Sequence, residues 1–442
     1  MKEKGILLSL FSLPSKYGIG DIGHEAYEFI DILSENGIKY WELLPINSSI
    51  ILPYSPTSYY ALEEDHISLD KLYEQGLISK PATRPVTDRA IYDEFKVKYY
   101  EEAFNNFKPT EEYEKFKANN PELENYTKYM VSKFGRTTEY YYFLQYIMQN
   151  QWMELKAYAN SKNVQLIGDM PVYPPFDSAE TMFHPECFQM KDGKFTFEAG
   201  TPPDYFNENG QKWDSPVYNM DYLRETGFKY LLDRYRFYFK IFDKVRIDYF
   251  RGYDSFFQIP YGKSGKEGFY VDGGSYEFFD KLLELPGVTI DRIIVEDLGD
   301  IRDETVALRN HYGFQRIKIL QFAVDLANGR DYDNEQENVI VYPSNHDCST
   351  IYGWYKELNN RNKENLKAFL RNNGCNDINV NHGVFQYCNK SKANTVIVQV
   401  QDLLGLDDYG RINYPGTDLE ENWTWKLRDF EDLRKRIQDI NL

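Results

Sequence analysis

Residues 242–254 read FDKVRIDYFRGYD, a short apolar run that carries Arg246 and Asp248 two positions apart. Side chains at i and i+2 of a β-strand point to the same side, so the run predicts an ion pair at the end of a strand. Such a pair is compatible with an ordinary structural salt bridge. It is equally compatible with a catalytic carboxylate and the cation that tunes its pKa.

Seven further runs of this kind recur along the chain, nearly continuous in Ile, Val and Leu, as is typical of parallel strands buried on both faces. Amphipathic helical patterns separate them. Eight strands that alternate with helices predict an α/β fold, a (β/α)8 TIM barrel. We expect the strands at residues 5–10, 40–46, 164–170, 244–250, 292–297, 317–323, 338–343 and 395–401.

The spacing of the expected strands is uneven, which predicts inserted subdomains after strands 2 and 3 of a single catalytic barrel over residues 1–442. After the second strand we expect a helical insertion over residues 50–135. It includes an amphipathic helix that carries Ile91, Phe95, Tyr99, Ala103 and Phe107. After the third strand, residues 174–220 are rich in Pro, Gly, Asn and Asp, which favours a long functional loop or subdomain.

The charge of the chain excludes several classes of partner. A net charge of −18 and a pI near 4.9 oppose binding to nucleic acid or to anionic lipid, which both need a basic patch. The aromatic fraction of 17% is compatible with sugar stacking and equally with ordinary packing.

Cofactor and membrane signals are also missing from the sequence. The four cysteines show no CxxC spacing, the six histidines no metal-ligand pattern, and there is no phosphate loop or EF-hand loop, so we expect neither a metal nor another cofactor. The start, MKEKGILLSLFSLPS, resembles a minimal signal peptide but lacks an A-x-A-like cleavage site. No apolar run approaches the roughly 20 residues that span a bilayer, and we expect a soluble cytoplasmic protein.

Acids stand at four of the expected strand ends, where the active site of a TIM barrel lies. They are Asp169, Asp248, Glu296 and Asp347. Taken singly, each is compatible with a helix cap or a surface ion pair. Together they suit retaining glycoside chemistry, which needs one carboxylate as nucleophile and another as acid and then base.

The surroundings of these acids suggest different tasks. Arg246 is expected to keep Asp248 ionised as the nucleophile, and the charge of Asp248 is expected to raise the pKa of Glu296, the general acid. Asp297 should point the other way, into the barrel wall. His346 and Asp347 offer a donor and an acceptor for sugar hydroxyls.

Several stretches, in this order, resemble the 4-α-glucanotransferases (amylomaltases or disproportionating enzymes) of glycoside hydrolase family 77 in the α-amylase clan. The likeness covers nearly the whole chain. Its stretches are LLSLFSLPSKYGIGDIG, WELLPI, GDMPVY, GTPPDYFNENGQKW, VRIDYFRGY, VEDLGDI, ILQFAVD and QDLLGLDDYGRINYPGTDLEENWTWKL.

The resemblance implies a (β/α)8 barrel that transfers α-1,4-glucan segments between maltooligosaccharides by double displacement, with no cofactor. Asp248 is then the nucleophile, Glu296 the acid and base, and Asp347 the residue that stabilises the transition state, helped by His346 and Arg246. The other implied substrate-binding residues are Asp169, Tyr54, Asp325 and, in a lid over the acceptor sites, Asp204 and Trp213.

The chain also departs from the family pattern. Tyr249 replaces the histidine of RIDHFRG, THDND becomes NHDCS with Cys348, and SAFAGN becomes SYYALE. Two rival functions are an α-1,4-glucan hydrolase of the same clan and a non-catalytic glucan-binding protein on a decayed barrel. The second rival predicts loss of one or more acids, yet all three are present.

Overall fold

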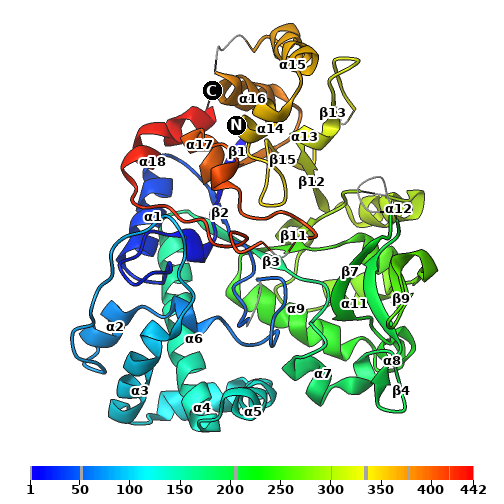
Figure 1. Ribbon diagram of the computed structural model, residues 1–442. Coiled ribbons are helices and arrows are strands. Elements are labelled where there is room, and N and C mark those ends of the chain that lie inside the picture. Colours follow the sequence, from blue (N-terminus) through cyan, green and yellow to red (C-terminus); the bar gives the residue numbers. More distant parts are fainter. Residues whose placement is uncertain are drawn as a thin grey trace.

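Eight parallel strands close into a barrel in the computed structural model, which describes residues 2–49, 53–203, 208–299, 301–332, 337–375, 379–417 and 419–441. The first and last strands, β1 and β16, pair with each other and close the ring. Figure 1 shows the two chain ends near each other. The predicted fold is therefore confirmed. In spatial order the strands are β1 (Glu3–Leu7), β16 (Thr395–Gln399), β15 (Val339–Tyr342), β12 (Gln315–Ile319), β11 (Ile293–Val295), β8 (Lys244–Ile247), β3 (Gln165–Met170) and β2 (Tyr40–Glu42).

Most barrel strands are shorter than the apolar runs that predict them. The expected strand at 317–323 ends at Ile319, because the helix α13 (Leu320–Ala323) takes up the rest of the run. The expected strand at 395–401 likewise gives way to α17 (Val400–Leu404). Periodicity alone does not separate a buried strand from a buried helical turn, so these boundaries were wrong by a few residues.

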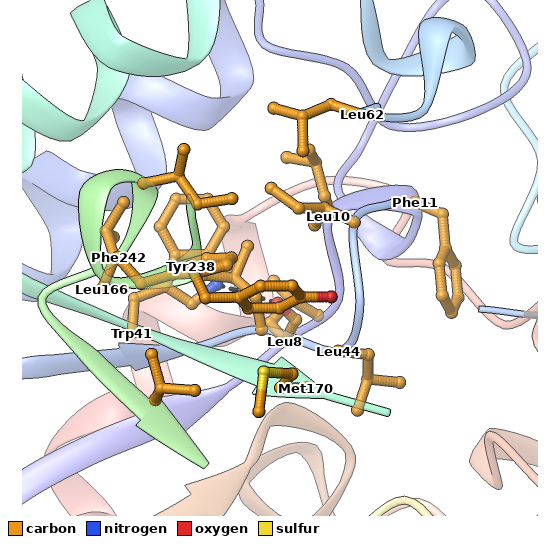
Figure 2. Packing of buried hydrophobic residues seen from close by; sticks show 14 of the residues in the cluster. Leu8, Leu10, Phe11, Trp41, Leu44, Leu62, Leu166, Met170, Tyr238 and Phe242 are labelled. Carbon is orange, nitrogen blue, oxygen red and sulfur yellow. Dashed lines mark hydrogen bonds between the residues drawn. The ribbon is translucent and has the colours of Figure 1, made fainter. Parts of the chain in front are cut away.

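Side chains alternate between two cores, one inside the barrel and one outside it. The inner core contains Leu7, Tyr40, Ile167, Ile294, Ile317, Ile319, Ile340, Tyr342, Cys348 and Ile397. The outer core is much larger and joins the strands to the surrounding helices. Figure 2 shows a part of it, where Trp41, Leu166, Tyr238 and Phe242 lie together.

Gly168 on β3 allows one close approach in this outer core. A Cβ atom at this position would lie 2.2 Å from Cδ2 of Phe242. A larger residue at 168 would therefore push Phe242 away from the strand that carries Asp169.

Helices occupy the connections between the barrel strands, as the alternating pattern predicts. Thr137 caps the longest of them, α6, by accepting a hydrogen bond from the backbone N–H of Tyr140. The longer connecting helices are α1 (His24–Glu35), α6 (Thr138–Ser161), α9 (Lys229–Ile241), α11 (Ser275–Leu283), α12 (Asp303–Tyr312), α15 (Asn360–Asn372) and α16 (Val380–Lys390), and α18 (Glu431–Arg436) follows β16.

Between β2 and α6 the described residues form four α-helices, at the lower left of Figure 1. Their bounds are α2 (Leu69–Glu74), α3 (Val97–Asn106), α4 (Glu111–Asn119) and α5 (Leu123–Phe134). The amphipathic helix expected from Ile91 starts only at Val97, after a 3₁₀ turn at Glu94–Lys96. The reason is local, since the Asp93 side chain accepts from the N–H of Phe95 and caps that turn. That residues 50–135 form one unit stays a prediction.

A separate four-stranded antiparallel sheet lies beside the barrel, in the order β10–β9–β6–β7. Two strands, β6 (Phe197–Thr201) and β7 (Gln211–Pro216), come from the segment 174–220. The other two, β9 (Ser255–Pro260) and β10 (Phe269–Asp272), come from the connection after β8. The sequence pattern had predicted a long loop or subdomain over residues 174–220, without strands, and had indicated no part of this sheet.

Three further properties concern the part of the chain described above. None of its helices has the length and apolar character needed to cross a bilayer. It holds no group of three or more His, Cys, Asp or Glu residues suited to a metal ion. The four cysteines are free thiols and are buried.

Candidate active site

The acids of the site face the inside of the barrel because they continue the inward phase of their strands. Ile167 on β3 and Ile294 on β11 both belong to the inner core. Asp169 and Glu296, each two positions further along, therefore point inward as well. The carboxyl ends of parallel strands meet at one edge, so these side chains gather at the barrel mouth.

Arg246 links two of these acids at the mouth. It lies between Val245 and Ile247, which belong to the outer core, so its guanidinium enters the barrel. Its Nη1 donates to Asp169 Oδ1 and Oδ2 at 2.6 and 2.7 Å and to Asp248 Oδ2 at 2.9 Å. The predicted Arg246–Asp248 ion pair is thus confirmed, and Asp169 is a second acceptor of the same cation.

Asp248 is the more accessible of these two carboxylates. Its side chain is 26% exposed, whereas the Asp169 side chain is 1% exposed. Burial raises the pKa of Asp248, Arg246 opposes this rise, and the charge of Asp169 adds to it. The expectation that Arg246 sets the ionisation of Asp248 was therefore incomplete, because the guanidinium is shared.

Glu296 follows directly after β11 and is buried. Its Oε1 accepts a hydrogen bond from the backbone N–H of Leu298 at 2.9 Å. Burial raises the pKa of Glu296 to about 8, and the nearby charge of Asp248 contributes to the rise. The predicted direction is confirmed, although burial outweighs the predicted cause, and Glu296 holds a proton at neutral pH.

Asp297, the next residue, faces away from the mouth, as predicted. It forms ion pairs with Arg309 and Arg316, the latter at 3.1 Å between Nε and Oδ2. Two neighbouring acids thus have separate environments, and Asp297 is structural.

A network of hydrogen bonds joins Tyr54, His346 and Asp347 to this cluster. The Tyr54 hydroxyl donates to Asp169 Oδ2 at 2.5 Å and lies 2.8 Å from His346 Nε2. The same Nε2 lies 3.0 Å from Asp347 Oδ2. Burial alone would raise the pKa of Asp347, but the His346 imidazole holds it well below the ordinary value. Asp347 thus remains ionised with 38% of its side chain exposed.

Sequence reasoning missed Trp423 and Asn413, which contact this network, and Glu42, a buried acid inside the barrel. The ring of Trp423 lies 5.5 Å from that of Tyr54 and 6.3 Å from that of His346, between centroids. Asn413 Nδ2 donates to Asp347 Oδ1 at 2.8 Å. Inside the barrel, Glu42 accepts from the Tyr342 hydroxyl at 2.7 Å. Residues 413 and 423 lie in the last stretch of the resemblance, but nothing in their spacing singled them out.

Trp213 on β7 also reaches the mouth. Its ring meets that of Tyr249, the residue after Asp248, edge to face at 5.2 Å and 89°. Asp325 behaves differently, because its side chain accepts from Asn328, Tyr332 and the backbone N–H of Ala327, all within its own hairpin. These contacts give Asp325 a local structural role and do not join it to the cluster. Asp204 lies outside the described residues.

Comparisons with known proteins agree with this geometry. The family model described as 4-alpha-glucanotransferase matches residues 8–139 and 131–432. The chain belongs to the 4-α-glucanotransferase family. It is 33% identical to the 4-alpha-glucanotransferase of Aquifex aeolicus, over 99% of this chain and 98% of that protein. It is also 33% identical to that of Clostridium butyricum, over 96% of each. The amylomaltase from Streptococcus agalactiae, solved in complex with acarbose, superposes with a TM-score of 0.92 at 28% identity, over 100% of this chain and 99% of that one.

The departures from the 4-α-glucanotransferase pattern now have positions in the structure. Tyr249 packs against Trp213 of the neighbouring sheet. Cys348 is buried, and its Sγ accepts from the backbone N–H of Asn345 at 3.2 Å. Glu63, in SYYALE, accepts from the N–H of Ser49 at 2.9 Å. All three residues serve local packing, and none displaces an acid of the barrel mouth.

A cavity of about 510 Å³ adjoins the site at Trp423. Pro53, next to Tyr54, also lines it, as do Phe11 and Tyr92. The Tyr92 hydroxyl donates to the carbonyl of Trp423 at 2.7 Å. The cavity therefore continues the barrel mouth toward the helices that follow β2.

Proposed function

We propose that this chain transfers α-1,4-glucan segments from a donor maltooligosaccharide to the 4-hydroxyl of an acceptor glucan or glucose. The observation that supports this proposal most directly is the pair of acids, Asp248 and Glu296, at the barrel mouth. Asp248 is held by a guanidinium, and Glu296 keeps a proton because it is buried. Retaining glycoside chemistry needs such a pair, one ionised and one protonated.

In the first step Asp248 attacks the anomeric carbon of the donor. The bond from that carbon to the glycosidic oxygen breaks, and Glu296 gives its proton to the departing oxygen. The products are a covalent glucosyl–Asp248 ester, an ionised Glu296 and the released sugar. The falling charge on Asp248 leaves Arg246 with Asp169 as its remaining carboxylate partner, so the cation stays compensated.

In the second step Glu296 takes the proton from the 4-hydroxyl of an acceptor. The acceptor oxygen attacks the anomeric carbon, the ester bond breaks, and Asp248 leaves as a carboxylate. Two inversions give net retention. Asp347 and His346 are placed to hold hydroxyls of the reacting sugar, and the negative charge of Asp347 stabilises the positive charge that develops on the ring.

Transfer instead of hydrolysis requires an acceptor that is positioned while water is kept out. We assign this task to the sheet segment 174–220, the proposed acceptor-site lid, with Trp213 as its aromatic surface. The cavity beside Trp423 offers space for further glucose units of the glucan. The Streptococcus agalactiae relative binds acarbose, a ligand of the kind this mouth would accept.

We also propose a cytoplasmic location. The four cysteines are free, buried thiols, a usage typical of a reducing compartment.

Incubation of the purified protein with maltotriose tests the proposed activity. A transferase yields glucose together with a ladder of longer maltooligosaccharides, seen by chromatography. The Asp248→Asn protein, prepared in the same way, controls for contaminating enzymes. Products no longer than maltotriose would instead establish the hydrolase, and no turnover at all would contradict both.

A further inference from the structure

The carboxylate of Asp347 is held from both sides. Its Oδ2 faces His346, and its Oδ1 accepts from Asn413 Nδ2 at 2.8 Å. Asn413 is 9% exposed and so is shielded from solvent. A carboxylate offers about four acceptor positions, so each oxygen keeps one free for a sugar hydroxyl.

The segment that carries Asn413 is fixed to the Asp347 loop by Arg411. Its Nε donates to the carbonyl of Asn413 at 2.8 Å, and its Nη2 donates to the carbonyl of Asp347 at 3.3 Å. A third bond, from Nη1 to Ser349 Oγ at 3.2 Å, ties the guanidinium to the end of the same loop. The Arg411 side chain therefore holds the backbones of Asn413 and Asp347 at a set distance from each other.

We propose that Asn413 is a positioning residue for the transfer reaction, one that fixes the plane of the Asp347 carboxylate toward the reacting sugar. This inference rests on the proposed function. The amide suits the task because it is a neutral donor. A lysine or arginine here would cancel part of the negative charge that the oxocarbenium-like transition state needs, whereas an amide orients the carboxylate and leaves its charge in place.

The proposal predicts where the kinetic effect falls. The ring charge that Asp347 stabilises develops only in the transition state, so misorientation should lower kcat and kcat/KM together, with little change in KM. Removal of a hydrogen bond to a charged group corresponds to a decrease in rate of about 10- to 100-fold, which is the decrease we expect in kcat.

The first test is Asn413→Ala, measured as initial rates on maltotriose per mole of folded protein. Asn160→Ala is the matched control, because Asn160 Nδ2 also donates to a carboxylate, Asp243 Oδ2, at 2.8 Å, and lies at the end of α6 just ahead of β3. The control should keep wild-type rates. A rate within twofold of wild type for Asn413→Ala, or a loss carried by KM alone, would overturn the proposal.

The second test is Asn413→Asp. This variant keeps the shape of asparagine, so it tests the proposal even if the alanine variant fails to fold. At neutral pH the introduced carboxylate repels Asp347 and cannot donate to it. As the pH falls, one proton is shared between the two carboxyls and the donor returns. The kcat/KM of this variant relative to wild type should therefore rise several-fold from about pH 8 to pH 5, since effects on Asp248 cancel in the ratio.

A ratio that does not change with pH would contradict the positioning role. Failure of the proposed function has a different signature, because the wild type itself would then make no ladder from maltotriose. Wild-type transfer with an unaffected Asn413→Ala variant overturns only the inference about Asn413.

Discussion

The inner and outer faces of the barrel wall treat two neighbouring acids differently. On the inner face, Glu296 has a backbone N–H as its hydrogen-bond donor, and burial raises its pKa to about 8. On the outer face, Asp297 is buried just as fully but forms ion pairs with Arg309 and Arg316. Glu296 is buried without an ion-pair partner among the described residues, which suits a proton donor, whereas two ion pairs make Asp297 a structural anchor.

The presence or absence of an ion-pair partner also distinguishes Asp248 from Glu296 at the barrel mouth. Asp248 has the Arg246 guanidinium at 2.9 Å and is the group we expect to be ionised. The pair therefore starts the reaction with one charge and one proton. Substitutions at these acids break or sharpen the comparison, and we give them from the largest expected effect to the smallest.

Asp248→Asn removes the proposed nucleophile while it keeps the size of the side chain. We expect kcat to fall by about 10⁴-fold or more, because no covalent intermediate can form. Glucan binding, measured by calorimetry with maltooligosaccharides, should persist. Turnover near the wild-type rate would contradict the double-displacement mechanism.

Glu296→Gln removes the proposed proton donor of the first step. Transfer from maltotriose should fall by about 10²- to 10⁴-fold, whereas a maltosyl fluoride donor, whose leaving group needs no proton, should still form the intermediate. Equal losses with both donors would rule out an acid role. In the wild type, kcat/KM should decline above about pH 8 as Glu296 ionises, and this alkaline limb should be absent from the variant with the fluoride donor.

The same substitution should stabilise the folded protein at alkaline pH. The folded pKa of Glu296 is raised, so its carboxyl favours folding in the protonated form, and it costs stability as the pH rises from about 4.3, its unfolded value, to about 8. Glutamine removes this cost. At pH 8 we expect a Tm about 2 to 4 °C above wild type, and at pH 4 little difference, by calorimetry.

Asp297→Asn should have the opposite effects to Glu296→Gln, with stability lost and activity largely kept. It leaves two buried arginine contacts without their carboxylate, so the free energy of unfolding should fall by about 3 kcal/mol in urea titrations. The folded fraction should transfer glucan within a few-fold of the wild-type rate. If Asp297→Asn lost as much activity as Glu296→Gln while it kept full stability, the inner and outer faces of the barrel wall would not have separate roles.

Trp213→Ala carries the smallest expected effect. We expect a few-fold rise in the ratio of hydrolysis to transfer, measured as reducing ends formed per longer product, because water gains access to the intermediate. Tyr261→Ala is the control, since Tyr261 is an exposed aromatic residue just after β9 that packs on Phe176. An unchanged ratio for Trp213→Ala would argue against the lid.

The sequence predicted the barrel well because each strand is a local apolar run, and it placed Asp248, Glu296 and Asp169 at the barrel mouth because each lies at the end of an expected strand. Asn413 and Trp423 were missed because their place at the mouth depends on how a long irregular segment crosses it. Asp325 was taken as a substrate-site residue from its motif, but its hydroxyl and amide partners lie in its own hairpin. The sheet of β6, β7, β9 and β10 was not predicted, because its two halves lie in different connections between barrel strands.

The pairing of β1 with β16 has a consequence for the order of synthesis. Glu3 pairs with Thr395, and the Lys2 ammonium donates to the carbonyls of Cys388 and Ser391 at 3.0 and 2.7 Å. The first strand to leave the ribosome thus waits for almost the last before the ring closes, while its apolar edge stays open to other chains. That edge therefore stays without its β16 partner while the nearly four hundred residues between the two strands are translated.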